Sequence, residues 1–304
     1  MADPGSAEYL ERLSAEGRKW GDHLQVEAAG HMAGWLDHPS IKAHYSQRGL
    51  LEGISWHAWV SRHFGGPANR SLELGCGSGT LSLRLVKFGA TREIEGIDAS
   101  PARIDEAERI RREKGIPGAF QVGDVNAVRL EPGRYDLIFS SHSFHHFLNL
   151  EEIMEQVGRA LTPRGLFILE EFVGPTQFQW TDLQIDMTRS LTALIPERFR
   201  ILPWGLVKPY EGRPTVEDVV AASPFESIRS AEISALFERR FRLIHRRNLG
   251  GTIQHLLYNG IMHNFRPEEP EAEAILRAIW TAEDALIDAA LLPSDFQLLI
   301  GRIL

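Results

Sequence analysis

The chain has 304 residues, of which 43% are hydrophobic, and its formal net charge is −8 at pH 7. This length and apolar content suffice for one large domain with additions or for two small domains. The acidic balance argues against nucleic acid as the main partner, and the longest apolar stretches fall well short of a membrane span. The one cysteine, Cys76, excludes an internal disulfide and indicates a reducing compartment, the cytoplasm.

The first part of the chain, residues 1–64, is expected to form helices that are rich in aromatic and histidine side chains. For any single one of these rings, the favoured interpretation is that it packs the helices against the rest of the fold.

A strand, a glycine-rich turn and a helix are predicted next, over residues 72–89. The turn has the pattern G-x-G-x-G at residues 75–79, whereas a dinucleotide site spaces its glycines G-x-G-x-x-G. Glycines let the backbone lie against a ligand, and the helix that follows presents free N–H groups to it. A carboxylate at Glu73 would repel a pyrophosphate, so the motif favours a ligand with an ammonium or sulfonium group.

Four further strands are predicted over residues 93–98, 119–124, 135–141 and 165–171. They are mostly apolar without strict alternation, which is typical of strands buried on both faces. Helical stretches separate them, and one of these begins at Ser100-Pro101. The alternation predicts a parallel, doubly wound α/β sheet.

Beyond the fifth strand, the chain departs from a minimal core. Gly174-Pro175 interrupts it, and an amphipathic helix is predicted over residues 178–200, before an irregular proline-rich loop. A sixth strand is expected at residues 241–246 and a seventh at 295–302, with helical stretches at 252–265 and 268–291 between them. We interpret 176–235 and 251–293 together as a partial lid. Such insertions commonly build a substrate pocket or an oligomer contact.

Five motifs, in this order and spacing, resemble those of the class I S-adenosylmethionine-dependent methyltransferases. The resemblance covers residues 65–175 closely. The matching residues are Glu73-Leu74-Gly75-Cys76-Gly77-Ser78-Gly79, Gly96-Ile97-Asp98-Ala99-Ser100, Gly123-Asp124-Val125, Phe139-Ser140-Ser141-His142-Ser143-Phe144-His145-His146-Phe147 and Leu161-Thr162-Pro163-Arg164-Gly165-Leu166.

The resemblance implies a seven-stranded sheet whose last strand is antiparallel, with S-adenosyl-L-methionine as the cofactor. The glycine loop and Glu73 would hold its methionine end, Asp98 its ribose, and Asp124 with Val125 its adenine; Asn126 is a weaker candidate. The expected cofactor-binding residues are Glu73, Gly75, Cys76, Gly77, Gly79, Asp98, Ala99, Ser100, Gly123, Asp124, Val125, Ser140, Ser141 and His142.

The resemblance also suggests a domain plan, in which the N-terminal helices fold over the cofactor. The expected parts are a helical cap at 1–64, the cofactor-binding core at 65–175, a lid at 176–235, further core strands at 236–250 and 294–304, and a helical insertion at 251–293.

A general base is sought at two places. Histidine titrates near working pH, which makes His142, His145 and His146 candidates. Glu170 and Glu171 end the fifth strand and point to opposite faces, so at most one of them is expected to reach the pocket, with Glu170 preferred. The expected catalytic set is Glu170, His145, His146 and Glu171.

No metal is expected, because neither a cysteine nor a carboxylate accompanies the three histidines at a ligand-like interval. The expected substrate-binding residues lie on the lid and are Phe178, Trp180, Arg198, Trp204 and Tyr210. Arg198 and Arg200 are the candidates for binding an anionic group of the substrate.

Methylation of a small molecule accounts for the cofactor motifs, the lid and the acidic charge together. Transfer to a hydroxyl oxygen is the first expectation. The alternatives are transfer to carbon, as on an alkene of a prenyl-type substrate with a carboxylate base, and a cofactor-binding protein without transferase activity.

Overall fold

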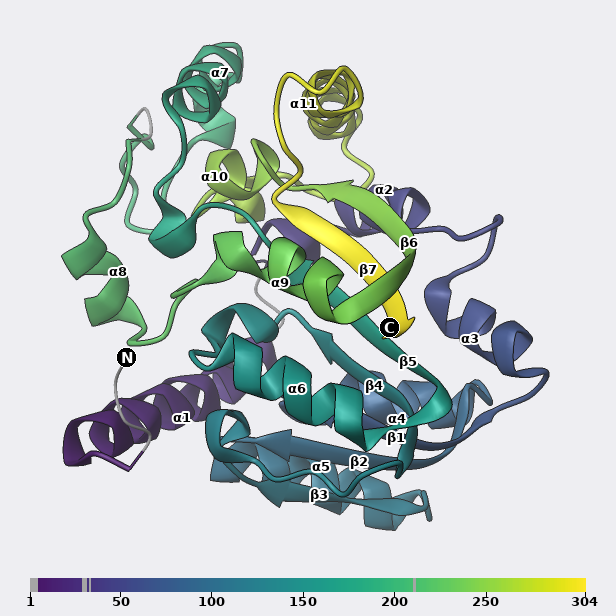
Figure 1. Ribbon diagram of the computed structural model, residues 1–304. Helices are drawn as coiled ribbons and strands as arrows, with labels where there is room; N and C mark the ends of the chain where they lie inside the picture. Colours follow the sequence, from purple (N-terminus) through teal and green to yellow (C-terminus); the bar gives the residue numbers. More distant parts are fainter. Residues whose placement is uncertain (1–4, 29–31, 33, 210–211) are drawn as a thin grey trace.

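A single mixed sheet organises the molecule (Figure 1). The computed structural model describes residues 5–28, 32, 34–209 and 212–304. Within these residues, seven strands pair in the order β3-β2-β1-β4-β5-β7-β6, and β7 runs antiparallel to both of its neighbours. The strands are β1 (Ala68–Leu74), β2 (Thr91–Asp98), β3 (Gly118–Val122), β4 (Tyr135–Ser141), β5 (Leu161–Phe172), β6 (Phe241–Gly250) and β7 (Phe296–Ile303).

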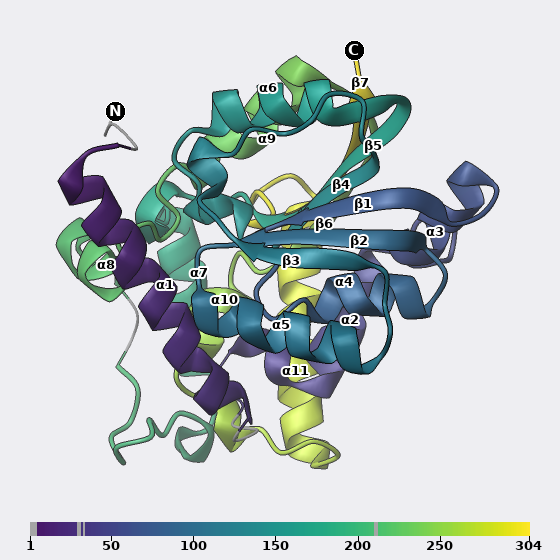
Figure 2. The same ribbon diagram turned by 90° about the horizontal axis from the view of Figure 1, so that it is seen from below.

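Helices cover both faces of this sheet (Figure 2). On one face, α4 (Thr80–Lys87), α5 (Pro101–Glu113) and α3 (Trp56–Phe64) contribute to a large apolar cluster. On the other face, α6 (Leu150–Ala160) and α9 (Ile233–Arg240) pack on apolar side chains of the central strands. The predicted doubly wound α/β fold, with an antiparallel last strand, is therefore confirmed.

The prediction that every strand is buried on both faces is wrong for β3. This strand lies at the edge of the sheet, and its last residue, Val122, is 53% exposed. The central strands follow the prediction, since Leu137, Ile138 and Phe139 of β4 are fully buried. An edge strand has a neighbour on one side only, so its hydrophobic pattern is a weaker guide to burial.

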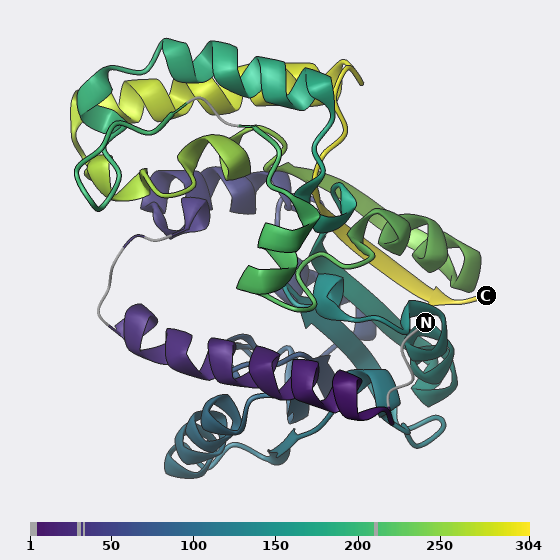
Figure 3. The ribbon, with the colours of Figure 1, turned by 90° about the vertical axis from the view of Figure 1, so that its left-hand side faces the viewer.

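The N-terminal helix α1 (Ala7–Ala28) lies along the edge of the molecule where strands β2 and β3 end (Figure 3). It approaches the turn after β2 through two glycines one helical turn apart. A Cβ atom on Gly17 would lie 2.8 Å from the carbonyl oxygen of Ala99, and one on Gly21 would lie 3.2 Å from Ser100 Oγ. The two glycines thus allow α1 to contact this turn closely.

The segments after β5 are more broken than expected. Instead of one helix over 178–200, there is a short 3₁₀ turn, η4 (Thr176–Phe178), and then α7 (Asp182–Ala193). The physical cause is local, because Gln177 and Phe178 have positive φ angles and Thr181 caps α7 through its side chain. The stretch predicted as a helix over 252–265 likewise divides into α10 (Gln254–Tyr258) and η7 (Met262–Asn264) around Gly260, whose φ angle is +75°.

The remaining elements complete the surroundings of the sheet. They are η1 (Trp35–Asp37), α2 (Pro39–Arg48), η2 (Val125–Ala127), η3 (Phe144–His146), η5 (Glu197–Phe199), α8 (Val216–Ala222), η6 (Ser230–Glu232) and α11 (Pro270–Asp288). Helix α10 contacts both α7 and α11, so the two insertions meet beyond β7. Among the helices of the described residues, none combines the length and the apolar content needed to cross a bilayer.

Candidate active site

A cavity of about 330 Å³ lies at the carboxyl ends of β1, β2, β3 and β4. The strand order reverses between β1 and β4, which is where parallel α/β sheets commonly bind ligands. Three acids from three neighbouring strand ends, Glu73, Asp98 and Asp124, line the cavity together. The sequence predicted this convergence.

The glycine turn forms one wall of the cavity. Gly75, Gly77 and Gly79 all have φ angles between +51° and +70°, a conformation that side-chain-bearing residues rarely adopt. The turn is held by Asp98, whose Oδ2 accepts a hydrogen bond of 2.8 Å from the backbone N–H of Gly77. At Gly75, a Cβ atom would collide with Ser143, so this position requires glycine for packing as well.

Glu73 is an unusual acid because it is only 3% exposed and has no basic partner among the described residues. Its Oε2 accepts a hydrogen bond from Ser82 Oγ. Burial raises the pKa of Glu73 to about 8, although the bonds from Ser82 act against this shift. A positively charged group in the cavity would stabilise its ionised form.

Asp124 connects the cavity to α1. Its Oδ2 accepts a hydrogen bond of 2.8 Å from the hydroxyl of Tyr9, and Asn126 Nδ2 donates to the same hydroxyl at 2.9 Å. Burial, followed by the bond to Asp124, raises the pKa of Tyr9 well above its usual value. The N-terminal helix is thus bonded directly to the residues expected to hold an adenine ring.

Not every residue predicted to bind the cofactor reaches the cavity. Three of them have structural roles instead: Ser140 Oγ donates to the carbonyl of Leu74, Gly79 packs against Phe120, and Ser100 precedes α5 with its hydroxyl buried. The predicted residues that line the cavity are Glu73, Gly75, Cys76, Gly77, Asp98, Ala99, Gly123, Asp124, Val125, Ser141 and His142.

His142 lines the cavity, and its side chain approaches the end of β5. Its φ angle of +52° is uncommon for a residue with a side chain, and its Nε2 lies 3.8 Å from Glu170 Oε1. Glu170 Oε2 accepts a hydrogen bond of 2.6 Å from the indole N–H of Trp56. Burial works against ionisation of Glu170, but His142 and Trp56 together lower its pKa.

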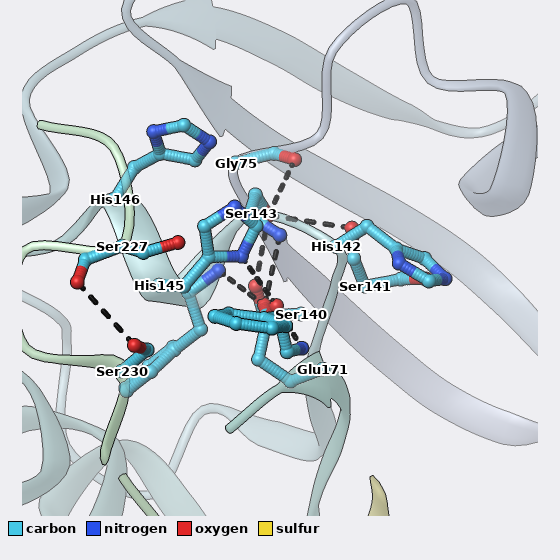
Figure 4. A network of polar contacts seen from close by, with 12 residues as sticks. Gly75, Ser140, Ser141, His142, Ser143, His145, His146, Glu171, Ser227 and Ser230 are labelled. Carbon is cyan, nitrogen blue, oxygen red and sulfur yellow. Dashed lines mark hydrogen bonds and ion pairs between the residues drawn. The ribbon is translucent and has the colours of Figure 1, made fainter. Parts of the chain in front are cut away.

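Glu171 points to the opposite face, as expected, and holds the loop after β4 (Figure 4). It is fully buried and accepts hydrogen bonds from the backbone N–H groups of Ser143 and Phe144 at 2.8 and 2.5 Å. His145 Nδ1 lies 2.5 Å from Glu171 Oε1. Burial alone would lower the pKa of His145, but the charges of Glu171 and Glu226 raise it to about 10.

The geometry therefore separates the predicted catalytic residues. Figure 4 shows His142 on the opposite side of Ser143 from His146. His146 lines the cavity, whereas His145, Glu170 and Glu171 do not. A protonated His145 is also unsuited to accept a proton.

The predicted substrate-binding residues are dispersed. Phe178 stacks on Trp180 with ring centroids 5.1 Å apart, and the indole of Trp180 donates to Asp295, so this pair packs inside the helical insertions. Arg198 is exposed and pairs with Glu269 and Glu271, and Trp204 is 68% exposed. Neither Arg198 nor Trp204 lines the cavity. The acids that pair with Arg198 lie at the start of α11. Tyr210 lies outside the described residues.

The sequence predicted that the N-terminal helices cover the cofactor but assigned none of their residues to the cavity, and it missed the segment after α8. The cavity-lining residues of α1 and of this segment are Leu13, Glu16, Gly17, Trp20 and Phe225, and those missed within the core are Ser78, Thr80, Leu81, Arg103, Ser143 and Phe147. Gly17 and Gly21, four residues apart in α1, form the sequence pattern that could have predicted its close contact with the turn after β2.

The lining fits the cofactor implied by the resemblance. A buried acid without a basic partner suits the positive charges of the methionine end, and Asp98 and Asp124 stand at the neighbouring strand ends. The open glycine turn leaves room that a Cβ atom would fill at Gly77, where the nearest side chain is Arg103 at 3.4 Å.

Comparison with known proteins agrees with this geometry. Residues 67–200 match the family model described as "Methyltransferase domain". The "Ubiquinone biosynthesis O-methyltransferase" of Methylobacterium nodulans is 30% identical over 116 residues, which cover 36% of this chain and 46% of that protein. "Squalene methyltransferase 1" of Botryococcus braunii is 31% identical over 143 residues, 44% of this chain and 38% of that protein.

The chain thus spans less than half the length of these two curated relatives. Among solved structures, "Phosphoethanolamine N-methyltransferase 2" of Haemonchus contortus, in complex with S-adenosyl-L-methionine, has a TM-score of 0.50 and 15% identity. The alignment covers 83% of this chain and 53% of that one, and it shows a shared fold. Residues 67–200 therefore match the methyltransferase-domain family model, and the seven-stranded sheet that contains them shares its fold with that solved structure.

Proposed function

We propose that this protein transfers a methyl group from S-adenosyl-L-methionine to a hydroxyl oxygen of a small molecule. The observation that carries the proposal is the single cavity lined by Glu73, Asp98 and Asp124 at three adjacent strand ends. The single buried thiol, Cys76, favours a reducing, cytoplasmic location.

The cofactor, when bound, supplies a methyl group activated by a positively charged sulfur. The protein then has to align the acceptor, exclude water and remove one proton. In our proposal, the glycine turn and the three acids bind the cofactor, and α1 shields it from water. The arguments for this assignment are the close packing of Gly17 on Ala99 and the bond from Tyr9 to Asp124.

We assign to His142 the role of the base that accepts the proton of the acceptor hydroxyl. His142 lines the cavity, and Glu170 Oε1 stands 3.8 Å from its Nε2. A carboxylate at this distance stabilises the imidazolium that forms when the ring accepts a hydroxyl proton. Glu170 then acts through His142 as a positioning residue, and its own bond to Trp56 keeps it ionised.

Carbon methylation is the second candidate, favoured by the apolar surroundings beyond His142. Phe172, Phe296 and Phe178 have ring centroids 5.3–5.7 Å from one another or from His255. Burial lowers the pKa of His255 to about 4, so its ring is neutral there. An alkene would fit such surroundings, with Glu170 as the carboxylate that removes the proton.

The test begins with methyl-labelled cofactor and a metabolite extract, in which the labelled product is identified by mass. His142→Asn is the decisive variant, since asparagine tolerates the left-handed backbone and cannot act as the base. We expect kcat on that product to fall by about 10²–10⁴-fold, while the homocysteine form of the cofactor still raises the melting temperature. Exposed His263→Asn serves as the control and retains wild-type turnover.

Glu170→Gln separates the two candidates. If His142 is the base, Glu170→Gln removes only the neighbouring charge that stabilises the imidazolium, so turnover falls less than in His142→Asn. Turnover retained by His142→Asn but lost by Glu170→Gln would instead make Glu170 the base, as carbon methylation requires, and fragmentation of the labelled product would locate the methyl group. Binding of the homocysteine form without any labelled product would leave a cofactor-binding protein and contradict the proposal.

A further inference from the structure

Two adjacent histidines and two glutamates from separate parts of the chain meet beside the cavity. His145 and His146 lie in η3, Glu226 follows α8, and Glu16 lies in α1. His145 Nε2 is 3.5 Å from Glu226 Oε1, and one ligand atom from each of His145, His146 and Glu226 lies within 4.8 Å of the others. Tetrahedral zinc, with bonds of about 2.1 Å, keeps its ligand atoms about 3.4 Å apart, so small side-chain rotations would close this triad around one ion.

The orientation of His145 is that of a metal ligand. Its Nδ1 faces the buried carboxylate of Glu171 at 2.5 Å, and Glu171 is itself fixed by the backbone N–H groups of Ser143 and Phe144. A carboxylate on one ring nitrogen sets the tautomer and leaves the other nitrogen free to coordinate. That other nitrogen, Nε2, points to Glu226.

The second histidine has a buried ring nitrogen beside Glu16. His146 Nδ1 is buried and makes no hydrogen bond with any described residue, although it lies 3.1 Å from Glu16 Oε1. Glu16 is held by the hydroxyl of Ser223 and the indole N–H of Trp20. Glu16 and His146 also line the cofactor cavity, so the cluster forms part of its wall.

The charges of the cluster favour a cation. Three carboxylates, Glu16, Glu171 and Glu226, are buried or nearly so. The cationic groups beside them are Lys19, with Nζ 3.9 Å from Glu226 Oε2, and the histidines when protonated. Unpaired charges inside a protein are costly, so these carboxylates need either protons on both rings or one divalent ion.

We propose that His145, His146 and Glu226 bind a divalent first-row cation, with Zn²⁺ as the reference ion, at the wall of the cofactor cavity. Imidazole and carboxylate ligands suit this group of metals. Glu16 is available as a fourth ligand, and Glu171 is a positioning residue. An ion that coordinates the Nε2 of His145 displaces the proton held there, so the ion enters as this proton leaves for solvent.

The sequence predicts no metal, because neither a cysteine nor a carboxylate accompanies the histidines at a ligand-like interval in the chain. Glu16 and Glu226 approach them only through the fold, 129 and 81 residues away from His145 by numbering. The proposal does not depend on methyl transfer, since the binding of an ion is measured without cofactor or acceptor.

The test is titration of chelator-treated, full-length protein with Zn²⁺ alone, followed by calorimetry and by metal analysis after gel filtration. We expect one ion per chain and, in buffers of different ionisation enthalpy, release of protons on binding. Glu226→Gln and Glu171→Gln each should weaken binding by about 10–100-fold, with unchanged circular dichroism. The matched control is His263→Gln on the exposed surface, which should bind as the wild type does.

Two outcomes overturn the proposal. One is the absence of stoichiometric Zn²⁺ in the wild-type protein. The other is equal affinity in wild type and Glu226→Gln, which would assign the ion to a different part of the chain. Should Glu226→Gln fail to fold, Co²⁺ added to wild type decides the matter, because its visible spectrum reports imidazole ligation directly and an unchanged aqueous spectrum rules it out.

Discussion

Glu73 is the residue on which the recognition of a positive ligand depends. It is buried at the end of β1 with a hydroxyl group as its side-chain hydrogen-bond donor, and burial raises its pKa to about 8. The folded protein without ligand therefore keeps a proton on Glu73 at pH values where an unfolded chain would have released it. A bound positive charge reverses this preference.

Replacement of Glu73 by glutamine should change how stability depends on pH. Because the pKa is raised on folding, wild-type stability without ligand falls as the pH rises from the ordinary glutamate value near 4.3 to about 8. We expect Glu73→Gln to match the wild type below about pH 4 and to be more stable by roughly 2–4 kcal/mol near pH 8. Thermal melts across this range measure the difference.

The control for this experiment is Glu113→Gln, an exposed acid on α5, which should reproduce the wild-type slope. Parallel pH profiles for Glu73→Gln and wild type would mean that Glu73 is already ionised in the empty cavity. Glu73→Gln should also bind the cofactor more weakly than the wild type, since glutamine lacks the negative charge of Glu73.

Sequence reasoning identified residues whose role follows from strand position. Glu73, Asp98 and Asp124 each follow or end a predicted strand, and parallel strands bring such ends to one edge. It could not assign Glu171, because a bond to backbone groups of the next loop depends on three-dimensional arrangement. Tyr9 and Glu226 were missed for the same reason, since each lies more than 80 residues from its partner in the site.

Among the elements, α1 has the most direct effect on the cavity. Its backbone contacts the turn after β2 at Gly17, and its Tyr9 bonds to Asp124. Helix propensity alone would favour alanine over glycine at position 17 by about 1 kcal/mol. The contact with the carbonyl of Ala99 opposes that preference.

Gly17→Ala should therefore weaken cofactor binding while it stabilises the isolated helix. The added Cβ would lie 2.8 Å from a backbone oxygen, which cannot turn aside as a flexible side chain can. We expect a loss of about tenfold or more in affinity for the homocysteine form, equivalent to about 1.4 kcal/mol. Isothermal titration measures it, with Arg18→Ala on the exposed side of α1 as the matched control.

An affinity unchanged by Gly17→Ala would show that α1 does not pack on the turn when the cofactor is bound.

The division of the chain into cap, core and lid, predicted from the sequence, can be tested by removal of the cap, which should leave the sheet folded.

The sequence predicted the elements correctly where hydrophobic runs are long, and wrongly where tertiary contacts determine the backbone conformation or the exposure. The bounds of β4 agree with the prediction to the residue, and its centre, Leu137-Ile138-Phe139, is a continuous apolar run. The break before α7 was missed because it depends on the positive φ angles of Gln177 and Phe178, residues with no glycine-like preference for them. β3 is exposed because it lies at the edge of the sheet. The hydrophobic periodicity of the sequence does not reveal the order of the strands.

At the scale of the molecule, the two apolar clusters on either face of the sheet make the core rigid, while the cavity lies between this core and α1. A ligand that binds only the folded state raises the free energy of unfolding of the whole protein. The insertions around α7, α10 and α11 meet beyond β7 and add a second helical layer.

We expect the homocysteine form of the cofactor, at about 100 times its Kd, to stabilise the protein by about 2.7 kcal/mol. Hydrogen exchange should slow most in α1 and in the glycine turn, and in β6 and β7, at the far side of the sheet, by no more than the gain in overall stability allows. Gly77→Arg, which fills the cavity at a residue with φ of +51°, should abolish both effects. An equal melting shift in Gly77→Arg would indicate a ligand site elsewhere.

The position of α1 has a kinetic consequence. A helix that closes one wall of the cavity, tied down at Tyr9 and packed at Gly17, obstructs the exit of spent cofactor as well as the entry of water. Each catalytic cycle would then include one undocking of this helix, and such gating steps commonly limit turnover. Glycerol or another viscogen would slow the steady state while leaving a single burst of product formation untouched.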